Sequence, residues 1–242
     1  MHIFLAGATG AIGRRLIPLL LADGHRVTGT TRSPTKAAEL EARGVAAVVI
    51  DVFDADRLRN AVVATRPEIV IHQLTDLPQV LDPAQLAASR QRNTRLRIEG
   101  TANLVAAALA AGSRRLIAQS IAFAYADSAE PHVETDPLAS PQGDDPSAVT
   151  VRGVRGLEDA VLGASGIDGI VLRYGRLYGP DTWFAEASGK GPLHVDAAAK
   201  AASLAVTHGA PGIYNVAEDD GALVIEMARR ELGFDPGFRL KA

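Results

Sequence analysis

Short apolar runs alternate with longer, helix-like segments from the first residue of the chain to the last. Apolar residues stand together in the runs, whereas in the longer segments they return every three or four positions. We expect strands at 2–6, 25–31, 45–50, 69–73, 115–119, 169–173 and 213–216, and helices at 11–23, 34–43, 54–64, 83–111, 148–164, 195–207 and 222–232. This order predicts an α/β fold with a doubly wound parallel sheet and helices on both of its faces.

Proline, aspartate, serine and glycine interrupt the pattern at 127–146 and 179–192, which we expect to be loops over a site. Two helices are expected to end at Gly44 and Gly112, because glycine adopts the left-handed conformation that closes a helix. We expect one domain over 1–242, with a small C-terminal substrate lobe formed by about 179–194 and 209–242.

Composition narrows the function classes. The chain has 242 residues, with 25 basic and 28 acidic side chains, a formal charge of −3 and no cysteine. No run of positive charge favours nucleic acid or an anionic membrane, so neither is an expected partner. Disulfides and thiolate metal sites are excluded, and no metal site is predicted. The N-terminus lacks the basic start of a signal peptide and the longest apolar run, 104–111, is too short to span a bilayer, so we expect a cytoplasmic protein.

The stretch IFLAGATGAIGRRLIPLLL places Gly7, Gly10 and Gly13 between the first predicted strand and helix. The first glycine permits a tight turn, the second lets the backbone approach a pyrophosphate, and the third lets the helix pack close to the strand. Amides at the start of the helix then bind phosphate with help from the helix dipole. This context predicts a Rossmann-type dinucleotide site, with an ordinary connecting turn as the alternative. The turn contributes three further cofactor-binding candidates, Thr9, Ala11 and Ile12.

The end of the second predicted strand distinguishes NAD from NADP, because an acid there binds the ribose hydroxyls and repels a 2′-phosphate. Thr30 and Thr31 stand in the acid's place, and Arg32 follows, with Lys36 one helical turn further on. We therefore expect NADP, with NAD as the alternative if Arg32 is only a solvated charge.

The third predicted strand ends in VVIDVFD, which contains Asp51 and Val52. Asp51 is expected to accept a hydrogen bond from the adenine amino group. The alternative is that Asp51 caps the next helix, a position that suits Asp54 better.

Further motifs follow in order: EGTANLVAAALAAGSRRLIAQSIAFAY, VLRYGRLYGP, LHVDAAAKAASLAV and PGIYNVAEDDG. Together with GATGAIG they resemble the extended short-chain dehydrogenase/reductase family, which includes nucleotide-sugar epimerases and dehydratases. The resemblance covers nearly the whole chain. It implies the fold, whereas the reaction has to be argued from the site, because one fold of this kind hosts many reactions.

The resemblance also implies which positions surround the nicotinamide and the reacting carbon: Gln73, Leu74, Thr75, Ser120, Ile121, Tyr174, Gly175 and Arg176. Ser120 is a candidate donor to a substrate oxygen, with a structural role at the strand end as the alternative. Relatives commonly pair the helices at 83–111 and 148–164 in a dimer, so the resemblance implies a homodimer.

The resemblance breaks at the family's proton-handling pair. Its members carry a tyrosine that exchanges the alcohol proton and, four residues later, a lysine that lowers the pKa of that tyrosine. With Glu158 aligned to the family's glutamate, those two positions hold Thr150 and Val154. No tyrosine and lysine elsewhere in the chain have this spacing.

The sequence offers three substitutes for the pair. Tyr125 is a candidate acid, although a tyrosine there is commonly structural in the family. Arg152 or Arg155 is a candidate to supply the positive charge of the missing lysine, but on an ideal helix each of their side chains points away from the direction of position 154. His132 or Glu134 is a candidate base, with a solvated loop residue as the alternative.

The helix at 83–111 carries arginines at 90, 92, 95 and 97. This pattern favours a solvated or partner-facing surface, with phosphate binding as the alternative. Arg97 falls where the family often has an asparagine beside the active site.

These observations leave two functions. The first is an NADP-dependent oxidoreductase or epimerase-like enzyme that acts on a small hydroxyl or carbonyl compound by hydride transfer, with Ser120 and Tyr125 as candidate catalytic residues. The second is a non-catalytic NAD(P)-binding sensor or interaction protein. The retained RYGRLYGP segment favours the enzyme, and the missing pair favours the second function. Because the C-terminal lobe is too small for a nucleotide sugar, we expect a smaller substrate.

Overall fold

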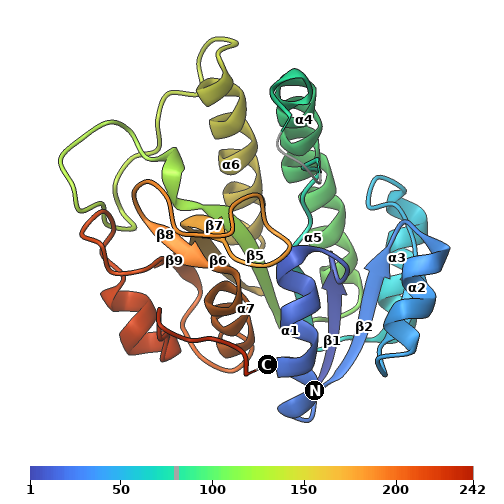
Figure 1. The fold of residues 1–242 in the computed structure, drawn as a ribbon. Coiled ribbons are helices and arrows are strands. Elements are labelled where there is room, and N and C mark those ends of the chain that lie inside the picture. The colour runs from blue at the N-terminus through green and yellow to red at the C-terminus, as the bar shows by residue number, and fades with distance from the viewer. Residues whose placement is uncertain (79–81, 242) are drawn as a thin grey trace.

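The computed structural model describes residues 1–78 and 82–241, and these contain a seven-stranded sheet in which each strand runs parallel to its neighbours (Figure 1). The strands are β1 (His2–Ala6), β2 (Arg26–Thr31), β3 (Ala46–Val49), β4 (Ile69–His72), β5 (Arg115–Ile121), β6 (Asp168–Tyr174) and β9 (Gly212–Val216). Their order is β3-β2-β1-β4-β5-β6-β9, so the chain reverses its direction across the sheet between β1 and β4. The predicted doubly wound α/β fold is confirmed, and ligands of such sheets bind at the carboxyl ends of the strands beside this reversal.

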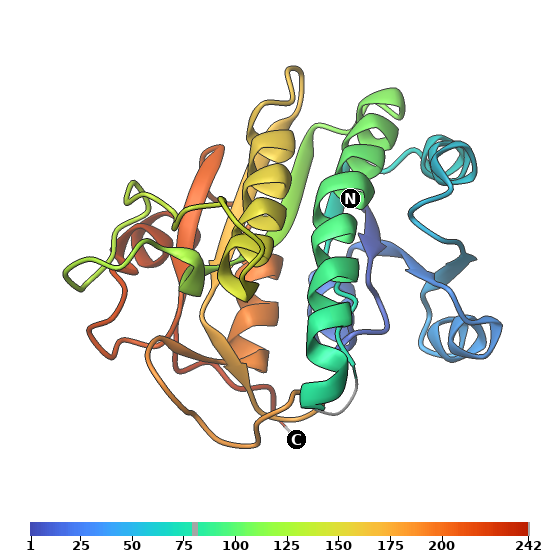
Figure 2. The same cartoon turned by 90° about the horizontal axis from the view of Figure 1, so that it is seen from above.

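Helices cover both faces of the sheet (Figures 1 and 2). One face carries α1 (Ala11–Ala22), α2 (Pro34–Glu41) and α7 (Val195–Leu204), and the other carries α3 (Ala55–Thr65), α4 (Pro83–Arg95), α5 (Thr101–Ala110) and α6 (Pro146–Leu162). Strand side chains are buried on both sides: Ile3 and Leu5 face the first layer, and Phe4 and Ala6 face the second. Burial on both faces explains why the strands are continuous apolar runs in the sequence.

The predicted elements are present with shifted ends, with two exceptions. The helix expected at 83–111 is divided by a π-helical turn, η1 (Leu96–Gly100), which separates α4 from α5. The prediction for 222–232 is wrong at its start, since the chain is helical only from Glu226, with η3 at Ala228–Leu232. Residues 222–224 instead pair with the loop at His132, whose amide donates to Ala222 at 3.0 Å and whose carbonyl accepts from Val224 at 2.9 Å.

A second, two-stranded sheet lies beside the carboxyl ends of the main strands (Figure 1). It consists of β7 (Arg176–Tyr178) and β8 (Pro192–His194), neither of which the sequence predicts, because each is only three residues long. A short turn, η2 (Ala122–Ala124), follows β5. Because β9 joins the main sheet, the boundary of a separate C-terminal lobe stays a prediction. Nowhere in the described chain does a helix have the length and hydropathy needed to cross a bilayer.

Two glycines let α6 lie unusually close to the α4–η1 segment. A Cβ on Gly153 would lie 3.0 Å from the Cα of Thr94, and one on Gly156 would lie 2.7 Å from the side chain of Ile98. The Thr94 hydroxyl donates to the carbonyl of Val149 at 2.9 Å. This close packing places the first half of α6 next to the π-helical turn.

Candidate functional site

The turn after β1 has the geometry that its glycines predict. Gly7 has a φ of 90°, and a Cβ there would overlap the backbone of Gln73. A Cβ on Gly13 would overlap the carbonyl of Gly7. Gly10 differs, because its Cβ would lie 3.4 Å from the nearest protein atom, an ordinary contact. The fold therefore requires Gly7 and Gly13, whereas Gly10 leaves the outside of the turn open to a ligand.

The start of α1 lacks the side-chain cap that five other helices possess. The N-cap side chains of α2, α3, α4, α6 and α7 accept hydrogen bonds from their first turns; they are Ser33, Asp54, Asp82, Asp145 and His194. Helix α1 begins after Gly10, and within the described residues no side chain caps it. The amides of Ala11 and Ile12 and the helix dipole are therefore available to an anion, and this turn fits a dinucleotide pyrophosphate.

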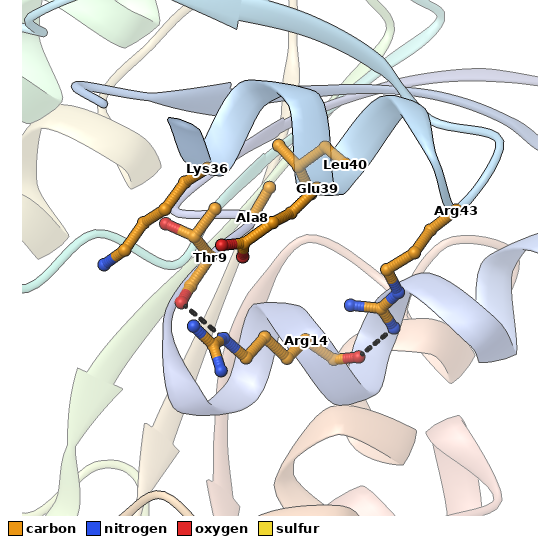
Figure 3. A pocket seen from close by; sticks show the side chains of 7 residues that line it. All are labelled: Ala8, Thr9, Arg14, Lys36, Glu39, Leu40 and Arg43. Carbon is orange, nitrogen blue, oxygen red and sulfur yellow. Dashed lines mark hydrogen bonds between the residues drawn. The ribbon is translucent and has the colours of Figure 1, made fainter. Parts of the chain in front are cut away.

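A positively charged pocket lies between the start of α1 and α2 (Figure 3). Its lining residues are Ala8, Thr9, Arg14, Lys36, Glu39, Leu40 and Arg43. Arg14 donates to the Thr9 carbonyl at 3.0 Å, and Arg43 donates to the Arg14 carbonyl at 2.9 Å, which fixes two of the three cations. Three cations against one carboxylate make this pocket, beside the end of β2, suitable for a phosphate.

The threonines at the end of β2 brace the turn. The Thr30 hydroxyl accepts from the Gly7 amide at 3.4 Å, and the Thr31 hydroxyl accepts from the Ser33 amide at 3.2 Å. Arg32 follows with an exposed side chain. No acid stands at this position, as the sequence indicates.

Asp51 and Val52 follow β3 as expected. Asp51 accepts from the Phe53 amide at 3.0 Å, while Asp54 is the residue that caps α3. The side chain of Asn103, on α5, donates to the Val52 carbonyl at 3.0 Å. The Asp51 side chain is exposed beside the expected adenine position.

Gln73, which follows β4, carries an unpaired polar atom. Its amide nitrogen donates to the hydroxyl of Tyr174 at 3.4 Å, while its Oε1 is buried without a partner in the described chain. Buried acceptors without a partner are rare in native proteins, and a hydroxyl or carboxamide of a bound nucleotide would satisfy this one. Leu74 is half-buried and Thr75 is exposed, and both lie next to it at the same sheet edge.

His72 is buried and uncharged. Its Nδ1 accepts from the Leu74 amide at 3.1 Å, so Nε2 carries the hydrogen and donates to the Thr101 hydroxyl at 3.0 Å. Burial, and secondly the positive charge of Arg97, lower the pKa of His72 to about 4. This imidazole holds the end of β4 against α5 as a neutral group.

Ser120 takes part in a buried ionic network. Its hydroxyl donates to Glu158 Oε1 at 2.7 Å, and Arg173 binds the two oxygens of the same carboxylate at 2.9 and 2.7 Å. Burial lowers the pKa of Arg173, but the hydrogen bonds and charge of Glu158 outweigh burial and raise it. The hydrogen of Ser120 is thus engaged by Glu158, and the proposed catalytic role of Ser120 stays a prediction.

An apolar cluster occupies the region of the missing proton-handling pair. Val154 is fully buried and packs with Val151 and with Ile121, the residue that follows Ser120. The Thr150 hydroxyl donates to the Pro146 carbonyl at 2.8 Å, one helical turn back. These contacts involve neither a phenol nor an ammonium group.

Tyr125 lies at the edge of the site with its hydroxyl engaged. It donates to the side-chain oxygen of Asn215 at 2.6 Å, and its ring stacks on His132 at 4.9 Å. Burial raises the pKa of Tyr125, although the nearby Arg173 opposes this shift. Glu134 accepts from the Asn215 amide at 3.0 Å. The catalytic role of Tyr125 also stays a prediction.

The other two proposed substitutes point elsewhere. Arg152 donates to the carbonyls of Pro141 and Gly143, and Arg155 donates to the carbonyl of Leu138. Both arginines therefore hold the loop before α6, and neither is engaged at position 154.

A pocket of about 270 Å³ lies beyond the ends of β5 and β6. Its walls include Phe123, Tyr125, His132, Arg176 and Lys190. The Arg176 guanidinium lies 5.0 Å from the centre of the half-exposed Phe123 ring. Asp127 and Glu130 also line it, and Lys190 is paired with Glu130 at 2.9 Å, so Arg176 is the lining cation left without a carboxylate partner among the described residues. An aromatic face beside this guanidinium suits a small aromatic anion.

Tyr174 ends β6, and Gly175, which follows it, lines this pocket. The Tyr174 hydroxyl donates to the Ala198 carbonyl at 3.2 Å, and burial raises the pKa of this tyrosine. A Cβ on Gly175 would overlap the carbonyl of Gly191. The cofactor contacts expected of Tyr174, Gly175 and Arg176 stay predictions.

Arg97 differs from its neighbouring arginines. The expectation of a solvated or partner-facing surface fits the exposed Arg92 and Arg95, but it is wrong for Arg97, whose exposed fraction is 7%. The resemblance gave one signal for Arg97, because this residue falls where the family often has an asparagine beside the active site.

Comparison with known proteins agrees with this geometry. Residues 7–207 match the NAD(P)H-binding family. A 3-diazoavenalumate denitrifying reductase from a Streptomyces species is 42% identical over 265 residues, covering 100% of this chain and 85% of the relative. A 2-alkyl-3-oxoalkanoate reductase from Shewanella oneidensis is 30% identical over 142 residues, covering 57% of this chain and 34% of the relative.

Solved structures share the fold at low sequence identity. A UDP-glucose 4-epimerase from Thermotoga maritima superposes with a TM-score of 0.78 at 18% identity, covering 99% of this chain and 94% of that one. A yeast methylglyoxal/isovaleraldehyde reductase complexed with NADPH gives 0.78 at 16% identity, covering 97% and 94%. From the family match, the shared fold and the reductase relative, we conclude that the chain belongs to the NAD(P)H-binding family as an extended short-chain dehydrogenase/reductase, and is an NAD(P)-dependent oxidoreductase or epimerase-like enzyme.

Proposed function

We propose that this enzyme is an NADPH-dependent reductase that acts on a small aromatic acid bearing a diazonium group and releases dinitrogen. The observation that carries the proposal is the apolar cluster of Ile121, Val151 and Val154 in the region of the family's proton-handling groups. A reaction that needs no proton from the protein is compatible with such a site.

Carbonyl and diazonium substrates differ in whether their reduction needs a proton. Reduction of a carbonyl to an alcohol takes up a hydride and a proton, and a positioned acid accelerates such a step by about 10²–10⁴-fold. The bound reduced nicotinamide supplies the hydride. A diazonium group, Ar–N₂⁺, accepts it at the terminal nitrogen to give Ar–N=NH. The carbon–nitrogen bond then breaks, N₂ leaves, and hydrogen replaces nitrogen on the ring, so the sum is Ar–N₂⁺ plus NADPH giving Ar–H, N₂ and NADP⁺ with no net proton.

The relative from Streptomyces supports this assignment, since its name describes a reductase that removes nitrogen from a diazo compound and it aligns with the whole of this chain. The pocket beyond β5 supports an aromatic acid. Phe123 offers a ring face, and Arg176, which has no carboxylate partner among the described residues, offers positive charge to a carboxylate.

The preference for NADPH over NADH is part of the same proposal. Arg32 and Lys36 stand after β2 with no acid in the usual position, and Lys36 lines the pocket together with Arg14 and Arg43. A 2′-phosphate is the group that such a cluster suits best.

The test is a stoichiometry measurement. The purified chain is incubated with NADPH and a carboxylated arenediazonium salt. NADPH loss, N₂ and the arene that carries hydrogen in place of the diazonium group are quantified, with an enzyme-free control. We expect all three in a 1:1:1 ratio. Loss of the diazonium salt without matching NADPH oxidation would refute the proposal.

A second candidate is reduction of a small carbonyl compound, the substrate class that the sequence suggests, with Tyr125 as the acid and Ser120 as a donor. The position of Tyr125 on the pocket wall favours it. The variant Tyr125→Phe separates the two functions. Diazonium reduction should survive the change largely intact, whereas a carbonyl reductase that uses this phenol should lose about 10²–10⁴-fold in kcat. A non-catalytic role is not favoured, and the cytoplasmic location and the homodimer stay predictions.

A further inference from the structure

Arg97 is a buried cation for which the described chain provides no partner. The residue is 7% exposed, and its guanidinium forms no hydrogen bond or ion pair within residues 1–78 and 82–241, while its nitrogens, unlike Gln73 Oε1, are not fully closed off from solvent. Arg92 and Arg95, on the same helical segment, have carboxylate partners in Asp76 and Glu99 at the surface. A buried charge without a partner is unfavourable, so such a group is expected to have a ligand.

The backbone makes room for this side chain. Arg97 lies in the π-helical turn Leu96–Gly100, a local distortion that is frequent at functional sites. A Cβ on Gly153 would lie 3.3 Å from the Cδ of Arg97. The arginine stem therefore lies against α6 one residue before Val154, which stands at the position of the family's lysine.

Two titratable groups, Glu158 and His72, lie within range of the charge of Arg97. Burial lowers the pKa of Arg97 to about 10, and the charge of Glu158 opposes the shift, so the group is charged near neutral pH. The positive charge of Arg97 in turn helps to lower the pKa of His72 at the end of β4. The stem of Arg97 thus lies against α6, and its charge acts on the residue directly before Gln73, which has the unpaired buried oxygen.

Glu158 does not serve as the partner. Its Oε1 accepts from the Ser120 hydroxyl and from Nε of Arg173, and its Oε2 accepts from Nη2 of Arg173. Both oxygens are committed to that network, so the charge of Glu158 acts on Arg97 only at a distance.

We propose that Arg97 takes over the cofactor-binding role of the lysine absent from position 154 and donates hydrogen bonds to the ribose hydroxyls on the nicotinamide half of the dinucleotide. A guanidinium is suited to this role, because its planar set of donors can serve two adjacent hydroxyls. The inference rests on NAD(P)H as the cofactor and not on the diazonium substrate. In the family the tyrosine transfers a proton and the lysine binds the ribose. According to this inference the chain keeps the ribose-binding function, through Arg97, and lacks the proton-transferring tyrosine.

The experiment compares two ligands by isothermal titration calorimetry on the full chain. NADPH contains the nicotinamide ribose, whereas 2′,5′-ADP contains only the adenosine half. The variants are Arg97→Met, which keeps the apolar stem, and Arg97→Lys, which keeps the charge; Arg90→Met on the same helix is the matched control.

We expect Arg97→Met to weaken NADPH binding by about tenfold to hundredfold, the effect of losing hydrogen bonds to a charged donor, and to leave 2′,5′-ADP binding unchanged. Arg97→Lys should show a smaller loss with the same selectivity, and Arg90→Met should show none. Without ligand, Arg97→Met should melt at the wild-type temperature or above it, because a buried unpaired charge has been removed.

Two results would overturn the inference: unchanged NADPH affinity in Arg97→Met, or an equal loss of affinity for both ligands. If Arg97→Met is too unstable to titrate, the same two affinities are compared between Arg97→Lys and wild type, and unchanged NADPH affinity or an equal loss for both ligands overturns the inference there. Failure of the wild-type chain to bind NADPH would overturn the cofactor assignment itself, and with it this inference. Failure of diazonium reduction alone would leave it standing.

Discussion

The buried network of Ser120, Glu158 and Arg173 allows a quantitative test of the site's electrostatics. The side chains of Arg173 and Glu158 are 4% and 5% exposed, with a nitrogen–oxygen distance of 2.7 Å. The perturbation consists of Glu158→Leu, Arg173→Met and the double variant. Each single change leaves an uncompensated charge of this pair in the interior, which costs about 3–5 kcal/mol, whereas removing both partners leaves neither charge of the pair.

The structure also predicts that the two single variants are unequal. Glu158 is the carboxylate whose charge acts on both Arg173 and Arg97. Its removal leaves two buried guanidinium groups without an anion, so Glu158→Leu should fall at the upper end of about 3–5 kcal/mol. Arg173→Met leaves Glu158 with the charge of Arg97 nearby and the hydrogen bond from Ser120, so it should fall at the lower end.

The assay is urea unfolding at neutral pH, followed by far-ultraviolet circular dichroism. The double variant should lose clearly less free energy of unfolding than the two single losses added together. Strict additivity would refute the coupling between Arg173 and Glu158. A larger loss of stability for Arg173→Met than for Glu158→Leu would refute the argument that the charge of Glu158 also stabilises the buried Arg97. Because Ser120 donates to Glu158, Ser120→Ala should cost about 1 kcal/mol and serves as the smaller reference change.

Three further predictions follow from the cofactor site and from His72. Gly10→Ala should have the melting temperature of wild type, because its Cβ would meet only the Gly7 carbonyl oxygen at 3.4 Å, but it should bind NADPH more weakly. Gly13→Ala should have a lower melting temperature, because its Cβ would overlap the backbone. A normal NADPH affinity in Gly10→Ala, measured by titration, would argue against pyrophosphate binding there. Replacing Arg32 and Lys36 together by alanine should weaken NADPH about tenfold or more and leave NADH unchanged; equal losses would count against a 2′-phosphate contact. Burial lowers the pKa of His72 to about 4, so between its ordinary value near 6.5 and about 4 the unfolded chain binds a proton that the folded chain does not. The free energy of unfolding should therefore fall as pH drops through this window, by up to about 3 kcal/mol, and an equal fall in His72→Gln would contradict this account.

Local signals explain the parts of the structure that the sequence predicts well. Gly7 and Gly13 are required by contacts within one turn or with the segment after β4, and Gly10 leaves the outside of that turn open, so the spacing of the three glycines predicts a dinucleotide site. The same holds for Gly44 and Gly112, whose φ angles of 79° and 71° close their helices. In each case the information lies in the backbone conformation that one residue type permits.

The errors have non-local causes. The segment 222–225 is a run of four apolar residues that leads into a helix, but Leu223 pairs with His132, and no residue near Leu223 in the sequence indicates that partner. Arg97 was assigned to a surface because periodicity was extended at 3.6 residues per turn through 83–111, whereas the π-helical turn changes which residues face inward. The space it occupies exists because Gly153, on another helix, has no side chain.

The apolar cluster of Ile121, Val151 and Val154 has a second consequence for the proposed reaction. An arenediazonium ion reacts with water to give a phenol, so a reductase acting on it must deliver hydride before water reaches the same group. Buried apolar side chains beside the expected reacting centre bind no water, whereas the family's tyrosine and lysine would each hold one. The residues that make this chain a poor candidate for alcohol and carbonyl chemistry therefore protect the substrate class we propose.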